Sequence, residues 1–114
     1  MEIAGLRERV NFEGAGHHQD EVGNDQSTYQ LLLSRWSKVE PLSSREREAL
    51  GLVEREEVLS VTLRYDKAIE AFDTRQVRLS FDGKVYNIHS MENLGFEDKT
   101  IRLRVTREVS HEQP

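Results

Sequence analysis

The sequence predicts a mainly β protein, a small antiparallel β-barrel of about six strands with one short α-helix between strands 2 and 3. Three segments, residues 59–65, 77–81 and 101–105, alternate apolar and polar side chains, which places the apolar ones on one face of each strand. After the second segment, Asp82-Gly83 accepts the positive φ angles of a type I′ turn and predicts a hairpin. Closure into a barrel is favoured because it hides strand edges that would otherwise aggregate.

The N-terminal part predicts two strands separated by a long loop. The first strand is expected over residues 6–12 and the second over residues 31–40, which Pro41 ends because proline removes a ladder donor. Between them, residues 14–30 hold three glycines, many polar side chains and few apolar groups to bury. We therefore expect a long mobile loop between strands 1 and 2, and because loops of this length are usually functional or disordered, it is a candidate contact arm.

A helix is expected directly after Pro41. Ser43 and Glu46 match the capping box, and residues 45–57 are rich in good helix formers. The apolar stripe is narrow and Gly51 weakens its middle, so the helix should dock lightly. The remaining strands are expected at residues 59–66, 76–81, 84–92 and 100–109, with a connector over 67–75, a turn at Gly95 and a frayed tail over 110–114.

Several side chains admit both a structural and a binding role. Arg102 and Arg104 alternate with apolar residues, so we expect them on the solvent face of one strand, with a phosphate- or partner-binding stripe as the alternative. Four aromatic residues could form a stacking platform for bases, but they fall on the apolar phases of their strands and the surrounding charge does not suit such a groove. Core packing is therefore favoured for Trp36, Tyr65, Phe81 and Tyr86.

Length and composition predict one soluble domain spanning residues 1–114. The chain has 16 Lys and Arg against 21 Asp and Glu, a formal net charge of −5, which disfavours nonspecific binding to DNA phosphates. The absence of cysteine excludes disulfides and fits a reducing compartment such as the cytoplasm. Neither a signal peptide nor a membrane-spanning apolar run is expected, so no membrane partner is predicted.

Catalytic signatures are not found in the sequence. It has no phosphate-binding loop and no Gly-x-Ser-x-Gly elbow, so we expect a protein that is not an enzyme and needs no cofactor. His17, His18, Asp20 and Glu21 lie together, but adjacent histidines in an extended segment point in opposite directions. A solvated loop without metal is favoured, and a metal-dependent enzyme using His17, His18 and Asp20 is the alternative from a different class.

The order of motifs along the chain is more specific than any one of them. Residues 6–10 (LRERV), a polar loop and residues 36–46 (WSKVEPLSSRE) are followed by residues 62–65 (TLRY) and residues 77–88 (VRLSFDGKVYNI). In this order they resemble the head–tail adaptor, or head-closure (stopper), family of tailed bacteriophages, over about residues 6–108. The chain departs from the family pattern at residues 66–70 (DKAIE), where a turn with Gly or Pro is more typical.

The resemblance implies a structural virion protein of the head–tail neck, assembled in the bacterial host cytoplasm. It implies a homo-oligomeric ring of about 12 copies under the portal and adaptor proteins, which closes the DNA channel after packaging and offers a docking surface to the tail. Such a ring would carry roughly 60 negative charges, which would let packaged double-stranded DNA pass without specific binding. The alternatives are a tail-terminator or other tail-side joining ring, and a free-standing regulatory binding domain.

Contact residues are expected in two segments. The segment facing the channel or a neighbour is expected to include Leu42, Ser43, Arg45, Glu46, Arg47, Glu54 and Arg55. The loop facing the adaptor or tail is expected to include His17, His18, Asp20, Asn24 and Asp25. Structural roles are expected for Trp36, Tyr65, Phe81, Asp82, Gly83 and Tyr86.

Overall fold

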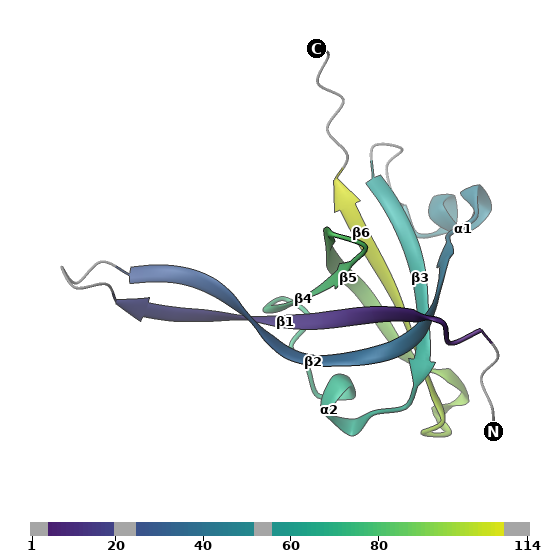
Figure 1. Cartoon of the computed structure of the whole chain (residues 1–114). Helices are drawn as coiled ribbons and strands as arrows, with labels where there is room; N and C mark the ends of the chain where they lie inside the picture. The colour runs from purple at the N-terminus through teal and green to yellow at the C-terminus, as the bar shows by residue number, and fades with distance from the viewer. Residues whose placement is uncertain (1–4, 20–24, 52–55, 109–114) are drawn as a thin grey trace, which may run out of the picture.

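The computed structural model describes residues 5–19, 25–51 and 56–108. Within these ranges the strands form a closed antiparallel barrel in the order β1-β2-β3-β6-β5-β4 (Figure 1). This confirms the predicted fold class, including the short helix between strands 2 and 3. The strands are β1 (Glu8–Gln19), β2 (Asp25–Pro41), β3 (Glu56–Arg64), β4 (Val77–Phe81), β5 (Lys84–Asn93) and β6 (Thr100–Glu108).

The barrel interior is filled by the apolar phase of each strand. Alternation along β6 buries Ile101, Leu103 and Val105 completely while Arg102 and Arg104 point outward. Each such aliphatic side chain contributes about 1.5–3 kcal/mol by leaving water. The largest fully buried side chains are Tyr86, Phe12, Leu63, Ile69, Leu79, Ile101, Leu103, Val10, Val61 and Val105.

The tight turn between β4 and β5 forms as predicted. Asp82 and Gly83 have φ angles of 53° and 76°, the left-handed values that a type I′ turn needs at both central positions. Phe81 pairs directly with Lys84 across it. The turn fixes the register that puts Leu79 and Tyr86 in the core as cross-strand partners.

The helix after β2 is shorter than the predicted residues 45–57. Helix α1 (Ser44–Ala49) begins as the capping box predicts, with the Ser43 side chain accepting a hydrogen bond from the Glu46 backbone N–H at 3.2 Å. Gly51 lies just beyond its end with a φ angle of 70°, a conformation that ends helices. The chain is again in a strand from Glu56, which pairs with Glu108 of β6.

The connector that departs from the family pattern forms a second short helix, α2 (Lys67–Glu70). Asp66 caps it by accepting a hydrogen bond from the Ala68 backbone N–H at 2.9 Å. Ile69 enters the core and is fully buried. A single turn of 3-10 helix, η1 (Leu94–Phe96), connects β5 to β6 at the predicted Gly95 turn.

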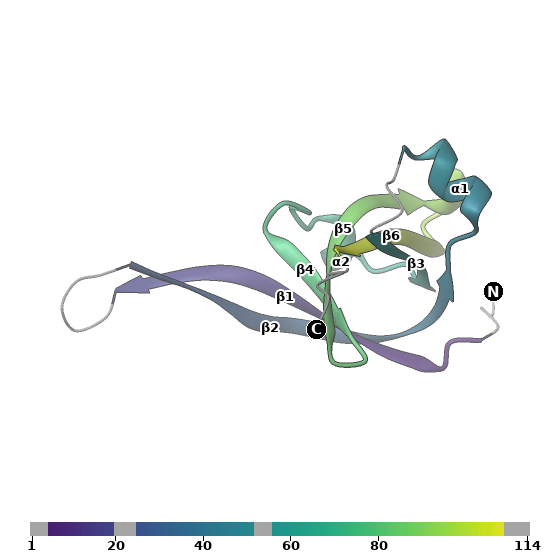
Figure 2. The same cartoon turned by 90° about the horizontal axis from the view of Figure 1, so that it is seen from above.

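The loop predicted over residues 14–30 is paired strand over most of its length. β1 continues to Gln19 and β2 starts at Asp25, with Ala15 opposite Tyr29 and Gln19 opposite Asp25. Pairing two strands satisfies their backbone groups without burying side chains, so the polar composition of this segment does not oppose it. The ribbon projects from the barrel as a long hairpin (Figures 1 and 2). We call its projecting part, residues 14–19 and 25–32, the arm.

Some expectations fall on residues that lie outside the described ranges. These are the frayed tail over residues 110–114 and the candidate contacts Asp20, Asn24, Glu54 and Arg55. In the part of the chain that is described, no helix is both long and apolar enough to cross a lipid bilayer.

Candidate interaction surfaces

The base of the arm is fixed to the barrel by an ion pair and a ring contact. β1 pairs with β4 only from Asn11 to Gly14, so the arm leaves the barrel at that point. There the Nε of Arg78 donates to the Glu13 carboxylate at 2.7 Å, and the Arg78 guanidinium lies 3.7 Å from the centre of the Tyr29 ring. One arginine of β4 thus contacts both strands of the hairpin.

The arm carries exposed apolar side chains from β2. Tyr29, Leu31 and Leu32 are all exposed, and Leu31 most, at 64%. The Leu32 side chain covers Gly14 so closely that a Cβ there would lie 2.9 Å from the Leu32 Cδ1. A cluster of large exposed apolar groups on one projecting element is typical of a surface that contacts another protein.

The residues expected to contact the adaptor or tail lie on this arm where they are described. His17 and His18 are opposite Ser27 and Gln26 in the ladder, and Asp25 is opposite Gln19. Among the described residues, no group of His, Cys, Asp and Glu is placed to hold a metal ion. Asp20, the third residue of the alternative metal site, lies outside them.

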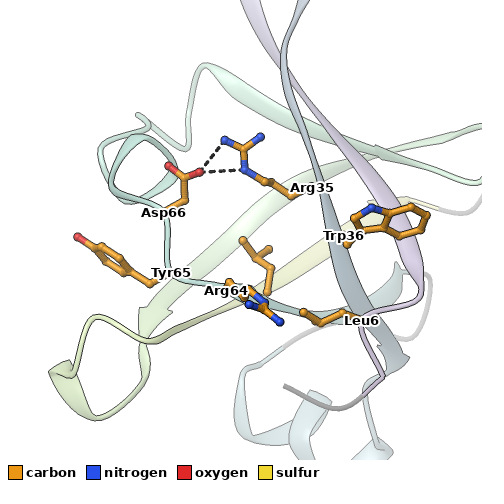
Figure 3. A pocket seen from close by; sticks show the side chains of 7 residues that line it. Leu6, Arg35, Trp36, Arg64, Tyr65 and Asp66 are labelled. Atoms are coloured by element: carbon orange, nitrogen blue, oxygen red, sulfur yellow. Dashed lines mark hydrogen bonds and ion pairs between the residues drawn. The ribbon is translucent and has the colours of Figure 1, made fainter. Parts of the chain in front are cut away.

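A second surface is a groove of about 550 Å³ near the start of β1 (Figure 3). It lies where β2 meets β3, and Leu6 from the segment before β1 forms part of its wall. Trp36 and Tyr65 belong to the same lining. We call this surface the Trp36 groove; its lining residues are Leu6, Arg35, Trp36, Leu63, Arg64, Tyr65 and Asp66.

One wall of the groove is an ion pair that also holds α2. Arg35 donates from Nε and Nη2 to the same Asp66 oxygen, at 2.9 and 2.7 Å (Figure 3). Burial by itself would raise the pKa of Asp66, but the hydrogen bonds from Arg35 and from the Ala68 backbone hold that pKa below its ordinary value. Asp66 is therefore charged at neutral pH, and Arg35 forms an ion pair with it.

The hydroxyl of Tyr65 forms its hydrogen bond with α2 and not with a residue that lines the groove. Its hydroxyl donates to the Glu70 carboxylate of α2 at 2.8 Å, and this bond, with smaller effects of desolvation and nearby carboxylates, raises the pKa of Tyr65 to about 12. The phenol stays protonated near neutral pH and serves as a donor. It has no role as a base there.

Trp36 corrects one prediction about the core. Its side chain is 55% exposed, whereas Tyr86 is buried as expected and Tyr65 and Phe81 pack partly buried against the core. The inward phase of β2 belongs instead to Ser37 and Val39. Lys38 and Glu40 share the phase of Trp36, and these two charged residues are the sequence signal that would have placed the indole outside.

Two arginines flank Trp36 across the sheet. Arg9 is its partner on β1 and places its guanidinium 5.2 Å from the centre of the indole ring. Arg64 lines the groove from β3 and is exposed. The register of β1 and β2 brings Arg9 beside Trp36, and Arg64 reaches the same groove from the end of β3.

The segment expected to face the channel or a neighbour is tied to the barrel wall. Leu42 is 7% exposed, so its side chain is buried within the single chain. Arg102 of β6 donates to Ser60 at 2.9 Å and to the Glu46 carboxylate at 3.1 Å, and Arg47 donates to the Glu56 carbonyl at 2.6 Å. The outward-facing Arg102 is thus engaged in holding α1 against β3 and β6.

A polar cluster joins the barrel strands beside β3. Glu57 accepts hydrogen bonds from Arg107, the shorter at 2.6 Å, and from the Tyr86 hydroxyl at 3.0 Å. The Arg107 bond, with help from Tyr86, lowers the pKa of Glu57 in spite of burial, while burial and the Glu57 bond raise the pKa of Tyr86. These hydrogen bonds keep the Glu57 carboxylate ionised and the Tyr86 hydroxyl protonated, which fits a structural role for the cluster.

A family model shows the family of the chain, and two solved structures share its fold. A family model described as phage head completion protein matches residues 1–108. The solution structure of protein SF1141 from Shigella flexneri 2a superposes with a TM-score of 0.72, at 21% identity over 98% of this chain and 100% of that one. A chain from the virion of a native gene transfer agent particle gives a TM-score of 0.62, at 14% identity over 89% of this chain and 93% of that chain. No curated protein matches the sequence.

Proposed function

The chain belongs to the family of phage head completion proteins, and from that premise we propose that it forms a ring at the head–tail neck. Family membership makes it a structural component of the phage head or neck. The ring would close the DNA channel after packaging and offer a docking surface to the tail. The match over residues 1–108, which includes the whole described barrel, is the observation that carries this proposal.

The shape of the chain supports a role in assembly. The barrel is closed and hides its strand edges, whereas the arm projects from it with exposed apolar side chains (Figure 2). The fold found in a chain of a gene transfer agent virion is the same, which is consistent with a place in a particle. A closed barrel with one projecting element suits a subunit that must contact neighbours.

Charge supports passage of DNA through such a ring. Each chain has a formal charge of −5, and a ring of about 12 copies would repel phosphates along any part of the channel that it lines. The outward arginines of β6 are engaged with carboxylates, since Arg102 pairs with Glu46 and Arg104 lies 3.8 Å from Glu92. Their pairing favours the structural role of this stripe over phosphate binding.

The α1 segment is the proposed gate or neighbour contact. Ser43 and Arg45 are exposed at its start, and the helix has no buried residue of its own. Deletion of residues 46–55 should leave a folded barrel, since none of the described residues of that range belongs to the core, yet give heads that leak DNA. Genome retention by heads carrying this variant at normal occupancy would contradict the gating assignment.

The test of the role uses DNA-filled heads that lack the protein. Adding the purified chain should restore both resistance of the packaged genome to nuclease and attachment of tails. If the protein restores tail joining but binds isolated tails and not filled heads, it belongs instead to the tail side of the joint. Heads that retain DNA and join tails equally well without the chain would contradict a role in the neck.

A further inference from the structure

We propose that free copies of this chain form a two-fold dimer in which Phe96 of each copy enters the Trp36 groove of the other. The inference goes beyond the proposed ring, because it concerns chains in solution before they join a particle. The two surfaces that meet are the Trp36 groove and the connection between β5 and β6, residues 94–98, which we call the Phe96 turn.

Phe96 projects from the barrel and does not pack on it. Its side chain is 93% exposed, more than that of any other large apolar residue in the described ranges. Its φ angle is 55°, a left-handed value that a bulky residue rarely adopts, and Gly95 and Asp98 have left-handed φ angles as well. Such backbone strain persists only where the surrounding structure imposes it, and it is often found at binding sites.

Hydrogen bonds hold the Phe96 turn against α2. The Asn93 side-chain amide donates to the Asp98 carboxylate at 2.7 Å and to the Glu70 carboxylate at 3.0 Å. The Asp98 backbone N–H donates in return to the Asn93 side chain at 3.2 Å. An apolar group on an ordered support loses little conformational freedom when it binds, so Phe96 is already in position for contact.

The Phe96 turn and the Trp36 groove lie at the same end of the barrel. Tyr65, which lines the groove, donates its backbone N–H to the carbonyl of Lys99, just beyond the turn, at 3.0 Å. The yellow-green connection between β5 and β6 and the start of β1 are both found at this end (Figures 1 and 2). Phe96 does not line the groove of its own chain. A two-fold axis between the two surfaces places each one on its counterpart in the other copy, so every contact forms twice.

The rim of the Trp36 groove is basic. Arg9 lies over the Trp36 indole and Arg64 lines the groove; both are exposed, and neither forms an ion pair with another described residue. Arg35 adds no net charge, because Asp66 pairs with it. A basic, aromatic groove on a chain with a formal charge of −5 favours an acidic partner that also presents an apolar group.

The Phe96 turn has both of these properties. Glu97 and Asp98 follow Phe96 directly, and Glu70 is bound to the turn, against one basic neighbour, Lys99. The three carboxylates form no ion pair with another residue of the described ranges. The groove, at about 550 Å³, has room for a phenylalanine side chain. Since one chain carries both complementary surfaces side by side, a second copy is the partner that fits them together.

The first test measures the mass of the purified full chain by sedimentation velocity at rising concentration. Arg64→Glu and Glu97→Arg should each weaken the dimer by about tenfold or more, because each places like charges in the contact. An equal mixture of the two variants should restore it, since residue 64 of each copy then faces the opposite charge at residue 97 of the other. Residues 96 and 97 are adjacent, and Trp36 and Arg64 line one groove, so a single pose makes both contacts.

Lys84→Glu is the matched control for these charge reversals. Lys84 is exposed at the far end of β5, nine residues from Asn93 and therefore about 30 Å along the strand from the Phe96 turn. This variant should form the dimer as well as the wild type does. Thermal melts of all variants establish that they are folded.

The second test uses the fluorescence of Trp36, the only tryptophan of the chain. The emission of the wild type should shift to shorter wavelength as the dimer forms and covers the indole. Phe96→Ala should remove the shift and weaken the dimer by about tenfold or more, although it removes no core contact. Leu31→Ala is the control, because Leu31 is exposed on the arm; it should keep the shift.

Three outcomes would overturn the inference. They are a wild-type chain that is monomeric at about 1 mM, where even a weak dimer forms, multimers that grow beyond dimers, and association that neither Phe96→Ala nor Arg64→Glu changes. If Arg64→Glu lowers binding to double-stranded DNA and leaves self-association unchanged, the groove faces phosphates and the inference is also wrong. No phage particle is used, so each of these results leaves the proposed role in the neck standing.

Discussion

The charge state of Glu57 makes the stability of the barrel depend on pH. Its hydrogen bonds with Arg107 and Tyr86 depress its pKa in the folded state below the ordinary value of 4.5. A group with a depressed folded pKa stabilises the protein above its unfolded pKa, and that contribution is lost as pH falls through the folded pKa. The difference in unfolding free energy between the wild type and Glu57→Gln should therefore be largest at neutral pH and shrink below about pH 4.5. Denaturant titrations at pH 7 and at successively lower pH test this; a difference that does not change would contradict the cluster.

Two substitutions of Tyr86 separate the contribution of its hydrogen bond to Glu57 from the contribution of its buried ring. Tyr86→Phe removes the donor to Glu57 but keeps the buried ring, so it should lower the unfolding free energy by about 0.5–1.5 kcal/mol. Tyr86→Ala also leaves a cavity and should cost about 3–5 kcal/mol. Chemical denaturation of both variants measures the two values, and equal losses would show that the hydroxyl and not the ring is the main contribution.

Substitution of Gly83 tests the type of the turn between β4 and β5. Its φ angle is 76° and a Cβ would meet nothing within 4 Å, so the cost of Gly83→Ala is conformational strain alone. We expect a loss of about 1–2 kcal/mol in unfolding free energy. Asp82→Asn is the matched control because asparagine tolerates the left-handed conformation, and its stability should stay near that of the wild type. A neutral Gly83→Ala would mean that the turn is not of the primed type.

Helix α1 depends on its contacts with the barrel, since six residues are too few to be stable alone. Arg102→Met removes the hydrogen bonds to Ser60 and Glu46 but keeps the apolar stem. Hydrogen exchange should become faster in residues 44–49, while the amides of buried β6 positions keep their protection. Arg104→Met is the control on the same strand face. Unchanged exchange in α1 would show that other contacts hold it.

The sequence alone predicted the strands in which alternating apolar and polar side chains determine which face is buried. The alternation in β3, β4 and β6 and the Asp82-Gly83 turn are signals of this kind, and the structure confirms them. The arm could not be predicted in the same way, because pairing of its strands rests on backbone hydrogen bonds that leave no mark on hydropathy. The groove depends on residues far apart in sequence, since Leu6, Trp36 and Tyr65 come together only through the fold.

At the scale of the molecule, a closed barrel carries two surfaces that its own fold leaves unused. The arm and the Trp36 groove face away from each other along one ribbon, and α1 sits on the barrel wall apart from the arm (Figure 1). This arrangement is consistent with a component of the phage head or neck.

The central claim is that copies of this chain form a ring around the DNA channel at the head–tail neck. Electron cryomicroscopy of complete particles tests it most directly, because density at the neck can be compared with the barrel and its arm. The account predicts a ring of barrels between the portal side and the tail. Particles that carry the intact gene product elsewhere, or a neck without density of this shape, would contradict it.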